Sequence, residues 1–139
     1  MFFTYGLRPH EVFKSQFLFN QNPPLIKVGE DTKTGSRTVF PLKNKKISLF
    51  ELKIPEFHVN LNLPNSRLGH QISKIFIKYP FTAYELRTYY AVRCAENGLS
   101  IVTASKWMGH SPQIHWKNYS SYLSDIESHS IWNTTFGKK

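Results

Sequence analysis

The chain has 139 residues, with 18 Lys and Arg against 9 Asp and Glu, so its formal charge is +9 with neutral histidine. A hydrophobic fraction of 40% suffices for one domain with a buried core and excludes a disordered or collagen-like chain. The single cysteine, Cys94, excludes an internal disulfide and a zinc site built on paired cysteines. No apolar run approaches the roughly 18 residues of a membrane span. The N-terminus also lacks the features of a secretory signal, so we expect a cytoplasmic protein without a membrane partner.

The N-terminal half is expected to contain short elements. Mixed apolar spacing favours a short helix over 7–18, which ends before an Asn-Pro-Pro stretch. Residues 25–28 and 37–40 have strand-like composition, and the polar tract 31–36 between them has turn chemistry. We therefore predict a β-hairpin with Lys33 on or beside its turn.

The C-terminal half is expected to be helical. Residues 43–65 lack sustained periodicity, which predicts an irregular connection with at most one short helix. Beyond it, the apolar spacing predicts helices over 66–78, 83–97, about 101–108 and 112–124. Gly98 and Gly109 follow two of these helices, where C-terminal caps are expected. A small sheet followed by helices predicts a mainly helical α+β fold, with a domain over 1–124 and a C-terminal tail over 125–139.

Four separated segments carry reactive residue types in a fixed order. They are Tyr5-Gly6-Leu7-Arg8-Pro9-His10-Glu11, Lys33-Thr34-Gly35-Ser36-Arg37, Tyr84-Glu85-Leu86-Arg87, and Gly109-His110-Ser111 followed by Tyr119. Arg87 precedes His110 by 23 residues, and His110 precedes Tyr119 by nine. The order and intervals resemble the catalytic domain of the tyrosine recombinases, the phage-integrase family, whose fold is mainly helical α+β with a small β-hairpin or sheet.

The resemblance implies site-specific DNA recombination or integration without a cofactor or metal. Tyr119 would be the nucleophile that forms a 3′-phosphotyrosyl link, so that strands can be rejoined without ATP. Arg8 and Arg87 would bind the scissile phosphate, since planar guanidinium forks match its oxygens and stay charged. Lys33 would protonate the leaving 5′ oxygen, and His110 would hydrogen-bond the phosphate.

One position departs from the family pattern. The His of the family's His-x-x-Arg is Tyr84 here, and a phenol with a pKa of about 10 is a poor general base near neutral pH. On a helix, Tyr84 would share a face with Arg87 and can still donate a hydrogen bond to phosphate. Some branches of the family, including cyanobacterial element-excision recombinases, also carry Tyr there. Thr88 likewise stands where many relatives have a second His.

Each of these residues alone has an ordinary interpretation. Arg8 and Glu11 fit a surface ion pair worth about 0.2–0.5 kcal/mol. Tyr119 fits a helix aromatic that packs with its neighbours Trp116 and Tyr122. The ordered set favours the catalytic interpretation, because the probability that all of these matches arise by chance is the product of their individual probabilities.

Three further residues need separate interpretation. Lys33 on a polar turn fits a solvated lysine. His110 and His115 are five residues apart, which disfavours zinc because helical metal ligands are spaced by four. We assign His115 no role beyond phosphate contact.

The expected partner is double-stranded DNA. Other basic residues suit contacts with the phosphate backbone: Lys43, Lys45, Lys46, Arg67, Lys74, Lys78, Lys106 and Lys117. Relatives usually place a DNA-binding domain before the first arginine, whereas Arg8 lies near the start of this chain. We therefore expect a truncated chain whose N-terminal DNA-binding domain is missing or separately encoded.

Two other functions stay open at this point. One is a catalytically impaired DNA-binding remnant of an integrase, which Tyr84 and the short chain favour. The other, a basic RNA-binding domain, rests only on charge and aromatic content. We also expect self-association on DNA, in which the tail packs on its own domain or on a neighbouring protomer through apolar side chains at Ile131, Trp132 and Phe136.

Overall fold

The structure, a computed structural model, describes residues 1–31, 34–42, 56 and 58–137. Two short helical segments come first, α1 (Phe2–Tyr5) and the 3-10 helix η1 (Pro9–Lys14). Three strands follow, β1 (Ser15–Leu18), β2 (Leu25–Val28) and β3 (Arg37–Val39). The described chain then forms helices α2 (Asn65–Phe76), α3 (Ala83–Glu96), α4 (Ile101–Met108) and α5 (Pro112–Phe136). Lys33 and most of the predicted connection, 43–55 and 57, lie outside the described residues.

The strands form one antiparallel sheet in the order β1-β2-β3. Ile26 at its centre pairs with Phe17 on one side and Val39 on the other. In β2, Ile26 and Val28 are buried whereas Lys27 between them is exposed, which is the alternation of a strand with one buried face. The hairpin predicted from residues 25–28 and 37–40 is therefore confirmed as β2 and β3.

The helix predicted over 7–18 is wrong over its last four residues, which form the strand β1. Pro9 begins the 3-10 helix η1, and Glu11 accepts the backbone N–H of Arg8 in a capping box. At Ser15 the backbone turns extended, with φ −118° and ψ 145°, and pairs with Val28. Pairing with β2 satisfies the backbone of β1, which a mixed apolar pattern alone does not reveal.

The predicted helices begin close to the expected residues, and polar side chains cap α3, α4 and α5. Thr82 accepts the N–H of Glu85 and starts α3, Ser100 starts α4, and Ser111 starts α5. The predicted end of α5 at residue 124 is wrong, since the helix runs to Phe136. No Pro or Gly interrupts the sequence between Pro112 and Gly137, so nothing in the backbone stops it earlier.

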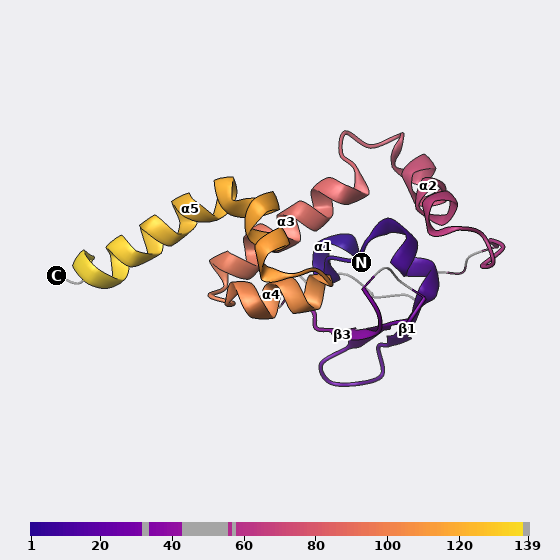
Figure 1. Ribbon diagram of the computed structural model, residues 1–139, viewed down its shortest axis with the longest axis horizontal. Helices are drawn as coiled ribbons and strands as arrows, with labels where there is room; N and C mark the ends of the chain where they lie inside the picture. Colours follow the sequence, from indigo (N-terminus) through magenta and orange to yellow (C-terminus); the bar gives the residue numbers. More distant parts are fainter. Residues whose placement is uncertain (32–33, 43–55, 57, 138–139) are drawn as a thin grey trace.

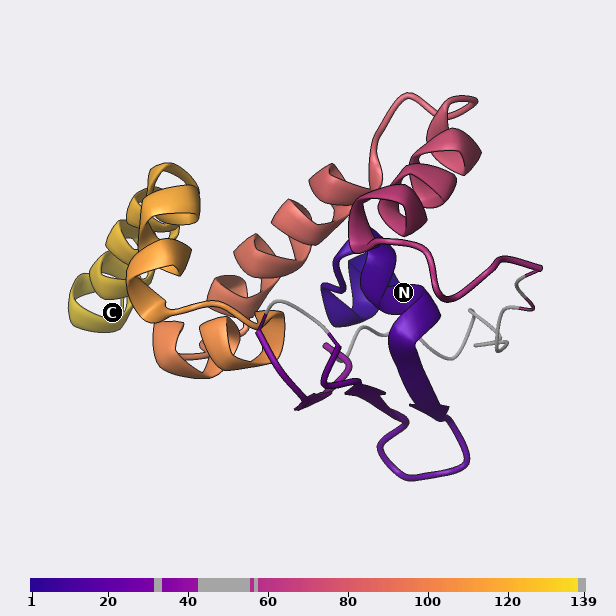
Figure 2. The ribbon, with the colours of Figure 1, turned by 45° about the vertical axis from the view of Figure 1, so that its right-hand side comes forward.

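Two hydrophobic clusters make up the core. The first joins α1, η1, the sheet and α2, with Tyr5, Ile26 and Leu68 fully buried. The second joins α3, α4 and the start of α5 around Tyr90 and Met108. In Figures 1 and 2, α3 lies between the α1–sheet region and the pair α4 and α5. The interior of the fold therefore has a seam along α3 where the two clusters meet.

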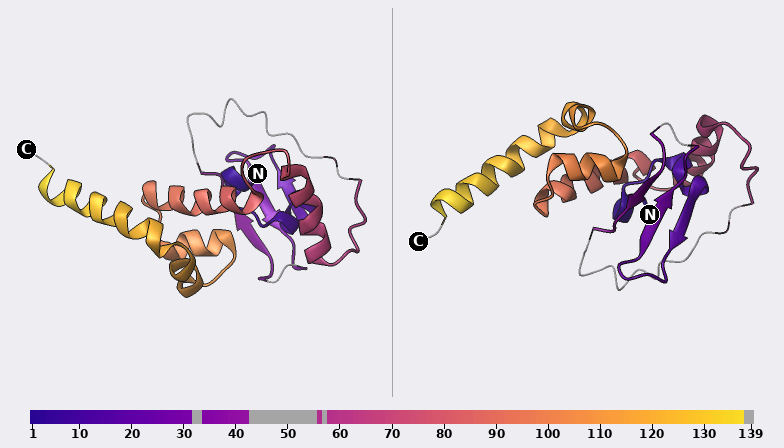
Figure 3. Two further views of the ribbon diagram at one scale, coloured as in Figure 1. Left: turned by 90° about the horizontal axis from the view of Figure 1, so that it is seen from above. Right: turned by 60° about the horizontal axis from the view of Figure 1, so that its bottom comes forward.

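The far end of α5 departs from this arrangement. Figure 3 shows α5 extending away from the rest of the molecule toward the C-terminus. None of the described helices has both the length and the apolar character needed to cross a membrane.

Candidate functional site

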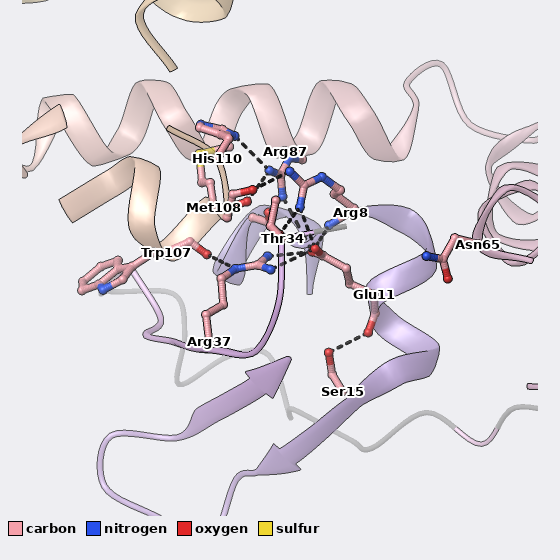
Figure 4. Close-up of polar contacts among 12 residues, drawn as sticks. Arg8, Glu11, Ser15, Thr34, Arg37, Asn65, Arg87, Trp107, Met108 and His110 are labelled. Carbon is pink, nitrogen blue, oxygen red and sulfur yellow. Dashed lines mark hydrogen bonds and ion pairs between the residues drawn. The ribbon is translucent and has the colours of Figure 1, made fainter. Parts of the chain in front are cut away.

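Polar side chains from four parts of the chain meet at the seam along α3. Arg8 precedes η1, Arg37 begins β3, Arg87 belongs to α3, and His110 lies in the turn between α4 and α5. Figure 4 shows these side chains converging near Glu11, the buried carboxylate of η1. Residues that are far apart in the sequence thus form one cluster.

Glu11 is the centre of this cluster and is fully buried. Its Oε1 accepts hydrogen bonds from Arg8 Nη1 at 2.8 Å and Arg37 Nη1 at 3.0 Å. Its Oε2 accepts from Arg37 Nη2 at 2.8 Å and from the Arg8 backbone N–H at 2.7 Å, and lies 3.9 Å from Arg87 Nη1. The interpretation of Arg8 and Glu11 as a surface ion pair is therefore wrong, because this carboxylate is fully buried and also pairs with Arg37.

The arginines also bind backbone carbonyls that tie the elements together. Arg87 donates to the carbonyls of Gly6 and Met108. Arg8 Nη2 donates to the carbonyl of Gly109 at 2.6 Å, and Arg37 Nε donates to that of Trp107 at 2.8 Å. The guanidiniums of Arg8 and Arg87, which are expected to bind phosphate, are thus held in fixed positions. Each donates to a carbonyl in the segment just before His110.

The charges in the cluster shift one another's protonation. Burial raises the pKa of Glu11, but the hydrogen bonds and charge of Arg37, the Arg8 N–H and the Arg87 charge outweigh it and lower that pKa to about 2. Burial, followed by the charge of Arg8, lowers the pKa of Arg87 to about 10. At neutral pH, Glu11 is ionised and Arg87 still carries its positive charge.

Three rings continue the cluster from Arg87 toward α5. His110 Nδ1 lies 3.4 Å from Arg87 Nη2, and His110 Nε2 lies 2.8 Å from His115 Nδ1. The His115 ring meets the Tyr119 ring edge-on, with centroids 4.9 Å apart. Tyr119 is only 7% exposed, and its ring packs against these two histidines rather than against Trp116 and Tyr122, which are exposed.

Arg8, Arg87, His110 and Tyr119, four of the residues singled out from the sequence, thus lie within one continuous set of contacts. The fifth, Lys33, lies outside the described residues, although Thr34 beside it in the sequence accepts a hydrogen bond from Arg8 at 3.2 Å. The sixth, Tyr84, stands apart.

Tyr84 is 60% exposed although it lies one helical turn before the buried Arg87. Its hydroxyl makes none of the hydrogen bonds that join Arg8, Arg87 and His110. Instead, it lines a surface pocket together with His10 and Asn65. The expectation that Tyr84 and Arg87 point at one site is therefore not met in this arrangement.

Arg37 and His115 belong to the site, although the motif order gives neither of them a catalytic part. Arg37 ends one of the motif segments, and in β3 it pairs with Val28 while its guanidinium donates to Glu11. His115 lies four residues before Tyr119, a spacing that places both on one face of a helix, and this is the signal that the sequence offers. Within the described residues, no three His, Cys, Asp or Glu side chains gather as metal ligands would.

Comparison with known proteins finds two similar chains from Nostoc sp. strain PCC 7120. Excisase A is 28% identical in an alignment 144 residues long, and this alignment covers 89% of this chain and 30% of the relative. Excisase C is 31% identical in an alignment 141 residues long, and this alignment covers 88% of this chain and 28% of the relative. The chain therefore spans about three tenths of the length of these relatives. No family model matches it, and no solved structure does.

Proposed function

We propose that this chain carries a strand-cleavage site for site-specific recombination of double-stranded DNA, in which Tyr119 is the nucleophile. The observation that carries the proposal is the convergence of Arg8, Arg87 and His110, from three separate parts of the sequence, beside Tyr119. The similarity to two proteins named excisases supports a role in DNA excision. The net charge of +9 supports a nucleic acid as the partner.

In the proposed reaction, the Tyr119 oxygen forms a bond to phosphorus while the bond from phosphorus to the 5′ oxygen breaks. The phenol gives up its proton to water, and the leaving 5′ oxygen gains a proton from Lys33, a role that we assign from the motif order. Arg8 and Arg87 stabilise the charge on the non-bridging oxygens, as positioned cations do in phosphoryl transfer. The 3′-phosphotyrosyl product keeps the bond energy needed to rejoin the strand.

The burial of Tyr119 bears on how the site would work. Because Tyr119 belongs to the second core cluster and is only 7% exposed, a phosphodiester must displace neighbouring groups to reach it. We propose that DNA replaces part of the internal bonding of Arg8, whose side chain remains 16% exposed. The same burial favours a second candidate function, DNA binding without cleavage.

A trapping experiment on randomised duplexes separates the two functions for any target sequence. Nicked duplexes with a randomised half-site lose the short strand after cleavage, which prevents rejoining and leaves the protein attached. We expect the wild-type chain to give an SDS-resistant adduct, and Tyr119→Phe to give none. Tyr122→Phe, an exposed tyrosine three residues further along α5, is the matched control and should form the adduct at the wild-type level.

Each outcome is decisive. An adduct with Tyr119→Phe would refute this choice of nucleophile. No adduct from the wild-type chain, with duplex binding retained in a filter assay, would instead establish the binding function.

A further inference from the structure

His115 is a buried polar side chain that the proposed reaction does not use. It is 1% exposed and lies on α5 one turn before Tyr119. Its backbone N–H donates to the Ser111 carbonyl at 2.9 Å, so the first turn of α5 holds its position. Its ring contacts both His110 and Tyr119, with centroids 5.1 Å and 4.9 Å away.

Arg87 determines where the protons of these histidines lie. A guanidinium can only donate, so His110 Nδ1, at 3.4 Å from Arg87 Nη2, must be an acceptor. Burial and the charge of Arg87, with smaller contributions from His115, Arg8 and Arg37, lower the pKa of His110 to about 3, which makes the ring neutral. A neutral ring that accepts at Nδ1 carries its proton on Nε2, and that atom lies 2.8 Å from His115 Nδ1.

The same reasoning gives the state of His115. Burial and the charge of Arg87 lower its pKa, so it is also neutral at pH 7. Since its Nδ1 accepts the proton of His110, its own proton lies on Nε2. The hydrogen bonds thus run in one direction, from Arg87 through His110 to His115, and both histidine rings contact the Tyr119 ring.

We propose that His115 is a positioning residue of the cleavage site: it accepts the His110 Nε2–H and braces the Tyr119 ring, which fixes the nucleophile relative to Arg87. The expected effect of His115 on the cleavage rate rests on the proposed function. The positions of the protons do not, because they are a property of the free protein. His115 and Tyr119 are four residues apart on one helical face, so a shift of the His115 ring is passed to the Tyr119 ring directly.

Two variants of nearly equal size separate hydrogen bonding from packing. In His115→Asn, the side-chain oxygen can take the place of Nδ1 as acceptor. His115→Leu fills the same space without an acceptor. Thermal melts of both variants identify any loss of folding.

The first measurement is made on the free protein by nitrogen-15 NMR of the histidine rings at pH 7. We expect His110 to be protonated on Nε2, with that proton visible in the wild type and in His115→Asn because the hydrogen bond slows its exchange with water. In His115→Leu the signal should be lost. Protonation of His110 on Nδ1, or an equally visible Nε2–H in His115→Leu, would overturn the assignment.

The second measurement is the single-turnover rate of adduct formation on a duplex recovered by the trapping experiment. We expect His115→Leu to be slower by about tenfold or more, as for loss of a hydrogen bond that orients a reacting group. His115→Asn keeps the acceptor but not the ring, so its rate should lie between those of His115→Leu and the wild type, and both variants should bind the duplex as tightly as the wild type does. A rate for His115→Leu equal to that of the wild type would refute the positioning role of His115 and leave the proposed function standing. Failure of the wild type to form any adduct would refute the proposed function, whatever the NMR result.

Discussion

At the scale of single residues, the buried carboxylate of Glu11 makes the arginine cluster possible. Three guanidiniums face one another within the seam, and without an anion their mutual repulsion and desolvation would oppose folding. The same anion explains why Arg8 and Arg87 are fixed before any phosphate arrives. Glu11 therefore links the stability of the fold to the readiness of the proposed site.

This link predicts how stability depends on pH. The pKa of Glu11 falls from 4.5 to about 2 on folding, so its contribution is complete above its unfolded pKa and is lost as pH falls through the folded one. We expect this group to account for about 3 kcal/mol of the free energy of unfolding, lost between about pH 5 and about pH 2. Urea titrations across this range measure the loss.

The matched variants for this measurement are Glu11→Gln and Glu96→Gln. Glu11→Gln leaves the arginines without their anion, so at pH 7 it should lower the free energy of unfolding by about 3–5 kcal/mol. It should also remove the loss of unfolding free energy that Glu11 causes in acid. Glu96 is exposed at the end of α3, and its substitution should leave the pH dependence as in the wild type. Equal pH profiles for Glu11→Gln and the wild type would contradict the assignment.

At the scale of elements, the turn between α4 and α5 sets the position of His110. Gly109 ends α4 in the left-handed region with φ +68°, which a glycine adopts without strain. A Cβ on this residue would lie 2.6 Å from the Arg37 guanidinium carbon and 2.8 Å from Thr34 Oγ1. The turn therefore needs glycine both for its backbone and for the space that Arg37 occupies.

Gly98 offers a control that separates these two needs. It has a similar φ of +73°, but nothing lies within 4 Å of its added Cβ. We expect Gly98→Ala to lower the free energy of unfolding by about 1–2 kcal/mol from backbone strain alone. Gly109→Ala should lose at least about 1 kcal/mol more, because Arg37 must leave its bonds to Glu11 and Trp107. Equal losses in urea titrations would show that Arg37 moves aside freely.

The elements differ in how well the sequence predicts them. Capping serines and threonines and the final glycines mark α3 and α4 closely, since these signals act within a few residues. The sequence does not predict the strand β1, because its backbone partner in β2 lies on another segment. The polar composition beyond residue 124 predicts too early an end for α5, whose backbone has nothing to stop it there.

The site shows the same division. The motif order identifies Arg8, Arg87, His110 and Tyr119, which the fold brings together. The partners that hold them, Glu11 in its buried role and His115, depend on contacts between distant segments. Pattern and spacing supply reactive groups, whereas burial and charge pairing appear only once the chain is folded.

At the scale of the whole molecule, the last part of α5 extends away from the core and exposes apolar side chains. Trp132 and Phe136 are exposed near its end, and Figures 1 and 3 show this part of the helix pointing away from the core. An isolated helix of about 12 residues is marginal in water, so residues 125–136 should exchange their amide hydrogens faster than 112–122 in the free protein. Hydrogen exchange measures this directly.

Deleting residues 125–139 then tests whether this segment acts in assembly. Because Trp132 and Phe136 are exposed, we expect the free energy of unfolding to change by less than about 0.5 kcal/mol. On a duplex recovered by trapping, the full chain should sediment as a larger complex than the shortened one, since the two exposed aromatic side chains can be buried against another protomer. Equal sedimentation of both complexes would refute a role in self-association, and a large loss of stability would mean that the segment packs on its own domain instead.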